Sequence, residues 1–290
     1  MSLSDAVQTE EQIADRPFDI VHSYHVNSQL FPTPAEQSVA TEPGHNRLLL
    51  INWKPATDMS WAAVAAGDAD ARIDREAAYL KANWTRPFFL TIYHEPEDNV
   101  VPTAGSGYTA SDYAAMYRHT VLRLRHDGVT NAITVMNYMA FDPWALKSWF
   151  SQLWPGDDVV DWIGLDPYGT GAPTGYLAHD FATLVNRKDG DFPGYYTWAT
   201  TAHPGKPIML CEWGISYDPN TPAGQASFFD TMVPEIGDFP HIHALVYYDV
   251  PVPPAGSHIL QTTVNLNTTA RDAYRAVGKS AQFTMPAWHY

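Results

Sequence analysis

The feature that most constrains the fold is residues 87–98, an apolar run that stops abruptly at a histidine and a glutamate. A short apolar run between two prolines is typical of a buried strand. In parallel α/β folds the functional side chains follow the carboxyl ends of such strands. Residues 206–214 repeat the layout, with a proline before the apolar run and Glu212 at its end. The two stretches therefore predict two buried strands that deliver Glu95 and Glu212 to the same rim.

The rest of the chain alternates strand-like runs with helical patterns such as residues 70–84, whose apolar side chains recur at helical spacing. Seven strands are predicted, ending near residues 24, 53, 95, 138, 168, 212 and 249. Such alternation indicates a parallel sheet with right-handed crossovers. We expect an α/β fold, a (β/α)8 TIM barrel that occupies residues 1–290 as a single domain. Because that barrel needs eight strands, the first is expected to be atypical or missing from the N-terminus, unless residues 282–285 or another segment fill its place.

Composition limits the class of partner. The 17 Lys and Arg residues against 32 Asp and Glu give a formal net charge of −15, which argues against nucleic acid and against a polybasic membrane attachment. No apolar window is long enough for a transmembrane helix. Cys211, the single cysteine, lies in an apolar strand and is expected in the core. No tight metal-ligand spacing or cofactor motif occurs, so we expect no metal and no cofactor.

A pair of carboxylates at one rim has a known chemistry. Two carboxylates break a glycosidic bond with retention at a separation of about 5–5.5 Å and with inversion at about 6.5–9.5 Å. Glu95 and Glu212 are separated by three strand positions, which lets them face each other across a barrel mouth. The competing interpretation is that each is a solvated residue at the start of a loop.

At this point the motifs resemble a known family. They are His94-Glu95, Trp154-Pro155-Gly156-Asp157-Asp158, Val160 to Tyr168, Lys206 to Met209 and Glu212-Trp213-Gly214. In order and spacing they are similar to glycoside hydrolase family 26, a clan A family of (β/α)8 barrels best known for β-mannanases, with some β-glucanases and β-xylanases. The resemblance implies a retaining enzyme with Glu95 as general acid/base and Glu212 as nucleophile. It also implies that His94 contacts the sugar and that Tyr168 hydrogen-bonds Glu212.

Further substrate-binding candidates are polar or aromatic residues at strand ends. Trp53, Trp213 and Tyr248 are candidate platforms for sugar rings, and for the two tryptophans core packing is an equal alternative. Asp166 has two interpretations, binding sugar hydroxyls or tying loops together. Glu97 and Asp98 either raise the pKa of Glu95 or face water, and water is favoured.

We therefore expect an endo-acting retaining glycoside hydrolase that cleaves a neutral β-linked polysaccharide of the β-mannan or β-glucan type. The alternative is a catalytically silent carbohydrate-binding barrel. Residues 96–98 read Pro-Glu-Asp where the family's mannanases usually have Met-Asn-Gly, so mannan is one candidate glycan among several. We expect a monomer that is secreted or at the cell surface, although the first residues do not read as a signal peptide.

Overall fold

The computed structural model describes residues 2–170, 179–253, 255 and 260–283. Within these ranges it has eight strands: β1 (Ile20–Val26), β2 (Leu48–Lys54), β3 (Phe88–Ile92), β4 (Ala132–Tyr138), β5 (Trp162–Leu165), β6 (Tyr168–Thr170), β7 (Ile208–Ser216) and β8 (Ile242–Tyr247). The α-helices are α1 (Leu3–Ala14), α2 (Pro34–Ala40), α3 (Trp61–Ala65), α4 (Asp70–Asn83), α5 (Ala110–His126), α6 (Asp142–Ala145), α7 (Phe181–Asn186), α8 (Tyr195–Ala202), α9 (Gly224–Glu235) and α10 (Thr268–Lys279).

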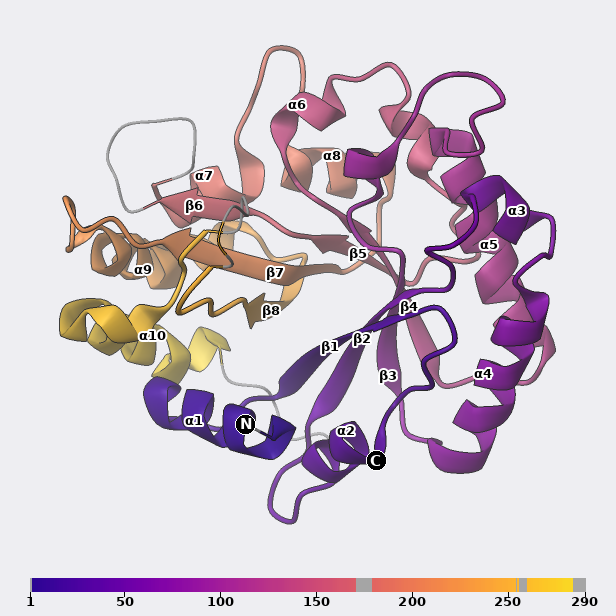
Figure 1. The fold of residues 1–290 in the computed structure, drawn as a ribbon. Coiled ribbons are helices and arrows are strands. Elements are labelled where there is room, and N and C mark those ends of the chain that lie inside the picture. The colour runs from indigo at the N-terminus through magenta and orange to yellow at the C-terminus, as the bar shows by residue number, and fades with distance from the viewer. Residues whose placement is uncertain (1, 171–178, 254, 256–259, 284–290) are drawn as a thin grey trace.

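All strand pairs are parallel, and the strands form one curved sheet with the helices outside it (Figure 1). The order is β1-β2-β3-β4-β5-β7-β8, and β6 pairs with the last residues of β7, beyond the part of β7 that pairs with β5. Seven positions of a barrel wall are thus filled. In the described ranges β8 pairs only with β7 and β1 only with β2, so the wall is open between β8 and β1. The predicted (β/α)8 barrel with an atypical or missing first strand is confirmed.

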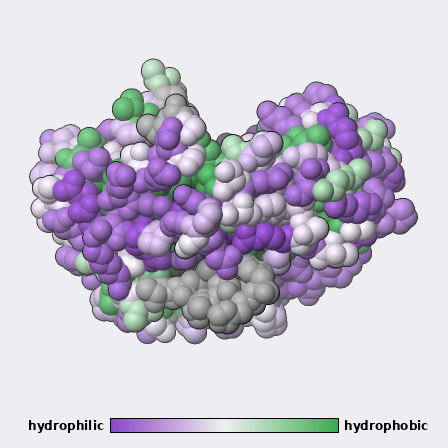
Figure 2. Space-filling model, turned by 90° about the horizontal axis from the view of Figure 1, so that it is seen from below, coloured by the Kyte–Doolittle hydropathy of each residue, from purple (hydrophilic) through white to green (hydrophobic). Residues whose placement is uncertain are grey.

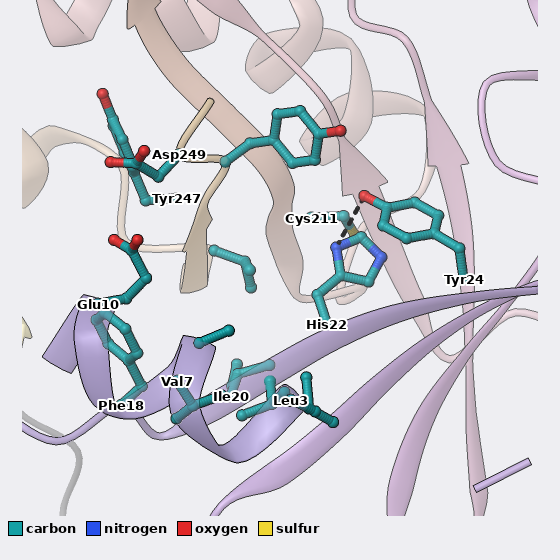
Figure 3. A pocket seen from close by; sticks show the side chains of 14 residues that line it. Leu3, Val7, Glu10, Phe18, Ile20, His22, Tyr24, Cys211, Tyr247 and Asp249 are labelled. Atoms are coloured by element: carbon teal, nitrogen blue, oxygen red, sulfur yellow. Dashed lines mark hydrogen bonds between the residues drawn. The ribbon is translucent and has the colours of Figure 1, made fainter. Parts of the chain in front are cut away.

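Helix α1 lies beside this opening in the wall (Figure 1). It begins at Leu3, where Ser2 and Asp5 form a capping box that satisfies the first backbone N–H groups. A cavity of about 210 Å³ lies between α1, β1 and the end of β8 (Figure 3). Gln282 and Phe283 belong to a short 3-10 helix rather than to a strand in the opening, and Thr284 and Met285 lie outside the described residues.

The alternation of side chains along each strand divides the core into two layers. Leu48 and Leu50 of β2 pack inside the barrel with side chains of β3, β4 and β7. Leu49, Ile51 and Trp53 point the other way and pack between sheet and helices. The parity of a strand residue therefore decides whether its side chain can reach the barrel mouth.

The surface is mainly hydrophilic on the side that Figure 2 shows, and it is hollowed there by a notch between two lobes. Among the described residues, no helix combines the length and the apolar character needed to cross a membrane.

Candidate active site

Glu95 is presented by a turn rather than by the strand itself. Strand β3 ends at Ile92, and the chain then adopts left-handed backbone conformations at Tyr93 (φ 55°) and Glu95 (φ 51°). Such conformations cost a non-glycine residue about 1–3 kcal/mol and cluster at functional sites. The backbone N–H of Glu95 donates to the carbonyl of Asn137 at the end of β4 (3.1 Å), which fixes the turn against the next strand.

Glu212 reaches the same rim through an irregularity in β7. Between Leu210 and Trp213 this strand has one residue more than its partner β8, which is a β-bulge. The extra residue reverses the parity of the strand, so Trp213 packs in the outer layer. Glu212 is thereby directed to the barrel mouth, where two phenols hold it. Tyr24 of β1 donates to its Oε1 (2.5 Å) and Tyr168 of β6 donates to its Oε2 (2.8 Å).

The two carboxyl groups have different surroundings. Burial and the charge of Glu212 raise the pKa of Glu95 to about 8, Lys54 opposes them, and Asp98 adds a smaller upward effect. No hydrogen bond from the described residues reaches the Glu95 carboxyl. Burial raises the pKa of Glu212 above its usual value, and the hydrogen bonds from Tyr24 and Tyr168 and the charge of Lys54 oppose this rise without cancelling it. The hydrogen bonds from Tyr24 and Tyr168 thus favour the anion of Glu212, and the Glu95 carboxyl lacks such donors among the described residues.

His94 is a neutral side chain of this site. Burial, Lys54 and His22 lower its pKa to about 3. Its ring meets the ring of Tyr24 edge-on at 5.5 Å, and its buried Nδ1 has no hydrogen-bond partner among the described residues. A buried polar atom without a partner in the free protein is available to a ligand.

Asp166 is a buried link between strands rather than a residue of the open cleft. Its Oδ1 accepts from the backbone N–H of Glu212 (2.8 Å), and its Oδ2 accepts from the side chain of Asn137 (2.7 Å). It is 1 % exposed, which leaves no room for a sugar hydroxyl. Of the two interpretations, the structure supports the one in which Asp166 ties segments together, and it positions Glu212.

The two tryptophans, which were candidate platforms for sugar rings, are buried. Trp53 is 1 % exposed, packs against Phe31 and donates from Nε1 to the carbonyl of Asn27 (3.1 Å). Trp213 is 3 % exposed and meets the ring of Tyr247 edge-on at 4.8 Å. Both occupy the outer layer, so neither offers a ring face to a sugar. Core packing, the alternative for both, describes them.

Tyr248 keeps its place at the rim. It is half-buried, its ring lies 6.3 Å from that of Tyr168, and the charges of Glu212 and Glu95, after burial, raise the pKa of its hydroxyl. It remains a predicted contact for substrate.

Glu97 does not face water, contrary to the favoured interpretation. It is 1 % exposed, and its Oε1 accepts from the backbone N–H of Met139 (3.0 Å). Burial raises its pKa to about 8, so it is a neutral acid below that pH. Asp98, in contrast, is exposed.

Two residues of the site were not predicted. Tyr24 lies 188 positions from the Glu212 that it contacts, and its Oη is also 3.4 Å from Nδ1 of His22 (Figure 3). Only the fold brings these groups together. Lys54 is the last residue of β2 and lies on the same inner side of the strand as Leu48 and Leu50. This alternation can be read from the sequence. In the described residues no group of three or more potential metal ligands occurs.

Comparison with known proteins supports the resemblance in sequence and in fold. No family model matches the chain. Endoglucanase H of Acetivibrio thermocellus is 28% identical over 219 residues, which are 72% of this chain and 22% of that protein. Beta-1,3-xylanase TXYA of Vibrio sp. is 34% identical over 106 residues, which are 35% of this chain and 21% of that protein. The chain thus spans about a fifth of the length of these relatives.

Solved structures share the fold. A ruminal GH26 endo-beta-1,4-mannanase superposes with a TM-score of 0.57 at 18% identity, over 95% of this chain and 59% of that one. The GH26 endo-beta-1,4-mannanase catalytic domain of Bacillus sp. JAMB-750 gives 0.55 at 18% identity, over 85% of this chain and 68% of that one. The chain is therefore a (β/α)8 barrel similar to the glycoside hydrolases of family 26.

Proposed function

We propose that this protein is a retaining, endo-acting glycoside hydrolase for a neutral β-linked polysaccharide, with Glu95 as acid/base and Glu212 as nucleophile. The observation that carries the proposal is the unequal environment of the two carboxyl groups. Glu212 receives two phenolic hydrogen bonds that favour its anion, while Glu95 has none and a pKa raised to about 8. Unequal carboxyl groups of this kind assign the acid and the anion in glycosidases.

The first step breaks one bond and forms another. A Glu212 carboxylate oxygen bonds to the anomeric carbon while the bond from that carbon to the leaving oxygen breaks, and the proton of Glu95 passes to the leaving oxygen. In the second step water attacks the anomeric carbon, its proton passes to Glu95, and the bond to Glu212 breaks. The hydrogen bonds from Tyr24 and Tyr168 keep the nucleophile ionised before each cycle.

The names of similar proteins suggest the substrates to try. They include an endoglucanase, a beta-1,3-xylanase and endo-beta-1,4-mannanases. We propose a β-glucan, β-xylan or β-mannan as substrate and place these three first in an assay. Such polymers occur outside the cell, which agrees with the prediction that the protein is secreted or attached to the cell surface.

The test is hydrolysis by the wild type and by two variants. Glu212→Ala is expected to abolish turnover of every substrate. Glu95→Ala is expected to retain activity only on aryl glycosides with good leaving groups, and azide is expected to restore part of its rate because it replaces water without needing a base. Wild-type rates in either variant would refute the assignment. A wild type that binds glycans without hydrolysing any of them would instead identify a carbohydrate-binding barrel.

A further inference from the structure

Lys54 is the basic side chain in the field of both carboxyl groups. It lies at the end of β2, next to β3, from which the turn to Glu95 departs. Its charge lowers the pKa of Glu95 and of Glu212. It also lowers the pKa of His94, after the larger effect of burial. Its ammonium is therefore directed to the part of the rim where the reaction is proposed to occur.

The position of this ammonium is fixed by an aromatic ring. Nζ lies 4.6 Å from the ring centroid of Tyr93, a cation–π distance. Tyr93 is itself held: its ring meets that of the buried Trp61 edge-on at 5.3 Å, and its hydroxyl donates to Oδ1 of Asn99 (3.2 Å). The Lys54 side chain is thus placed before any substrate arrives, which reduces the entropy that it loses on binding.

Lys54 forms no hydrogen bond and no ion pair with any other described residue. Burial lowers its pKa, and the charges of Glu95, Asp98 and Glu212 counteract this. An ammonium has three hydrogen-bond donors, so the partly buried ammonium of Lys54 can donate to a ligand.

We propose that Lys54 is a specificity residue of this site, whose ammonium donates hydrogen bonds to hydroxyl groups of the sugar ring that lies beside Glu95 and Tyr93. The inference rests on the proposed function. A neutral sugar fits better than an acidic one because an anionic substituent here would be repelled by Glu212 and Asp98.

The test compares steady-state kinetics of wild type and variants across pH on the best glycan substrate. Lys54→Met keeps the length of the side chain and removes its charge and donors. We expect its KM to rise by about tenfold, the loss of roughly one hydrogen bond to a charged group. We also expect both limbs of the pH profile of kcat/KM to move upward by about half a unit or more, because the loss of a nearby cation raises the pKa of both carboxyl groups. Lys54→Arg is expected to keep both limbs near their wild-type positions.

A matched control distinguishes this role from a structural one. Lys147 lies over the ring of Trp144 at 5.8 Å, in an exposed position outside the field of the two carboxyl groups. Lys147→Met is expected to leave KM and both limbs unchanged. Lys54→Gln serves as a second neutral variant, and circular dichroism verifies the fold of each.

The outcomes separate the two proposals. A folded Lys54→Met or Lys54→Gln variant with wild-type KM, or with unmoved limbs, would overturn the role of Lys54 while the hydrolase assignment stands. A wild type that hydrolyses no glycan would overturn the proposed function itself.

Discussion

The hydrogen bonds from Tyr24 and Tyr168 to Glu212 give the sharpest prediction. Replacing either tyrosine by phenylalanine removes one donor from the ionised carboxylate and leaves the ring in place. A hydrogen bond to a charged group is worth about 1.5–3 kcal/mol. At about 1.4 kcal/mol per pKa unit, each loss raises the pKa of Glu212 by roughly 1–2 units. The lower end applies to Tyr24, which is 43 % exposed and leaves room for water as a replacement donor.

The assay is the pH dependence of kcat/KM for the wild type, Tyr24→Phe and Tyr168→Phe. The acidic limb reports the ionisation of Glu212, so it is expected to move to higher pH by about 1 unit in Tyr24→Phe and by up to about 2 units in Tyr168→Phe. The alkaline limb, set by Glu95, is expected to stay because neither phenol contacts that carboxyl. Movement of the alkaline limb alone, or no movement of either, would refute the assignment of Glu212 as the ionised partner.

Two further predictions concern stability. Burial raises the pKa of Glu97 from 4.5 to about 8, so the folded protein loses unfolding free energy as pH rises through this window and the buried carboxyl must ionise. Glu97→Gln is expected to flatten this fall between about pH 5 and 8 in urea denaturation. A parallel fall in the wild type and the variant would contradict the burial argument. Trp53→Ala is expected to lower the unfolding free energy by about 3–5 kcal/mol, because removal of a fully buried indole leaves a cavity, and Trp53→Phe is expected to lower it less. A loss of substrate affinity without a loss of stability would instead show that Trp53 binds substrate.

The barrel was predictable because its evidence is local. Each buried strand is a short apolar run between breakers, and their alternation with helical patterns leaves few topologies. The two carboxyl positions were predictable for a related reason, since Glu95 and Glu212 each stand where an apolar run stops, although β7 continues past Glu212 to Ser216. The opening between β8 and β1 follows from counting strands.

The tryptophans show where such reasoning stops. Trp53 could have been placed correctly from the alternation of side chains along β2, because it lies on the opposite side of the strand from Leu48, Leu50 and Lys54. For Trp213 no such signal exists. A bulge before it reverses the parity of β7, and a one-residue excess over β8 is visible only in the paired strands. The contact from Tyr24 to Glu212 likewise depends on the curvature of the sheet, which brings β1 toward β7, rather than on any spacing in the chain.

The central claim is that Glu212 forms a covalent bond to the sugar, and the stereochemistry of the product tests it most directly. Proton NMR during the first minutes of hydrolysis of the best β-glycan would show which anomer of the new reducing end appears first. Double displacement predicts that the β-anomer appears first and then mutarotates. Initial release of the α-anomer would show inversion and would contradict the role given to Glu212.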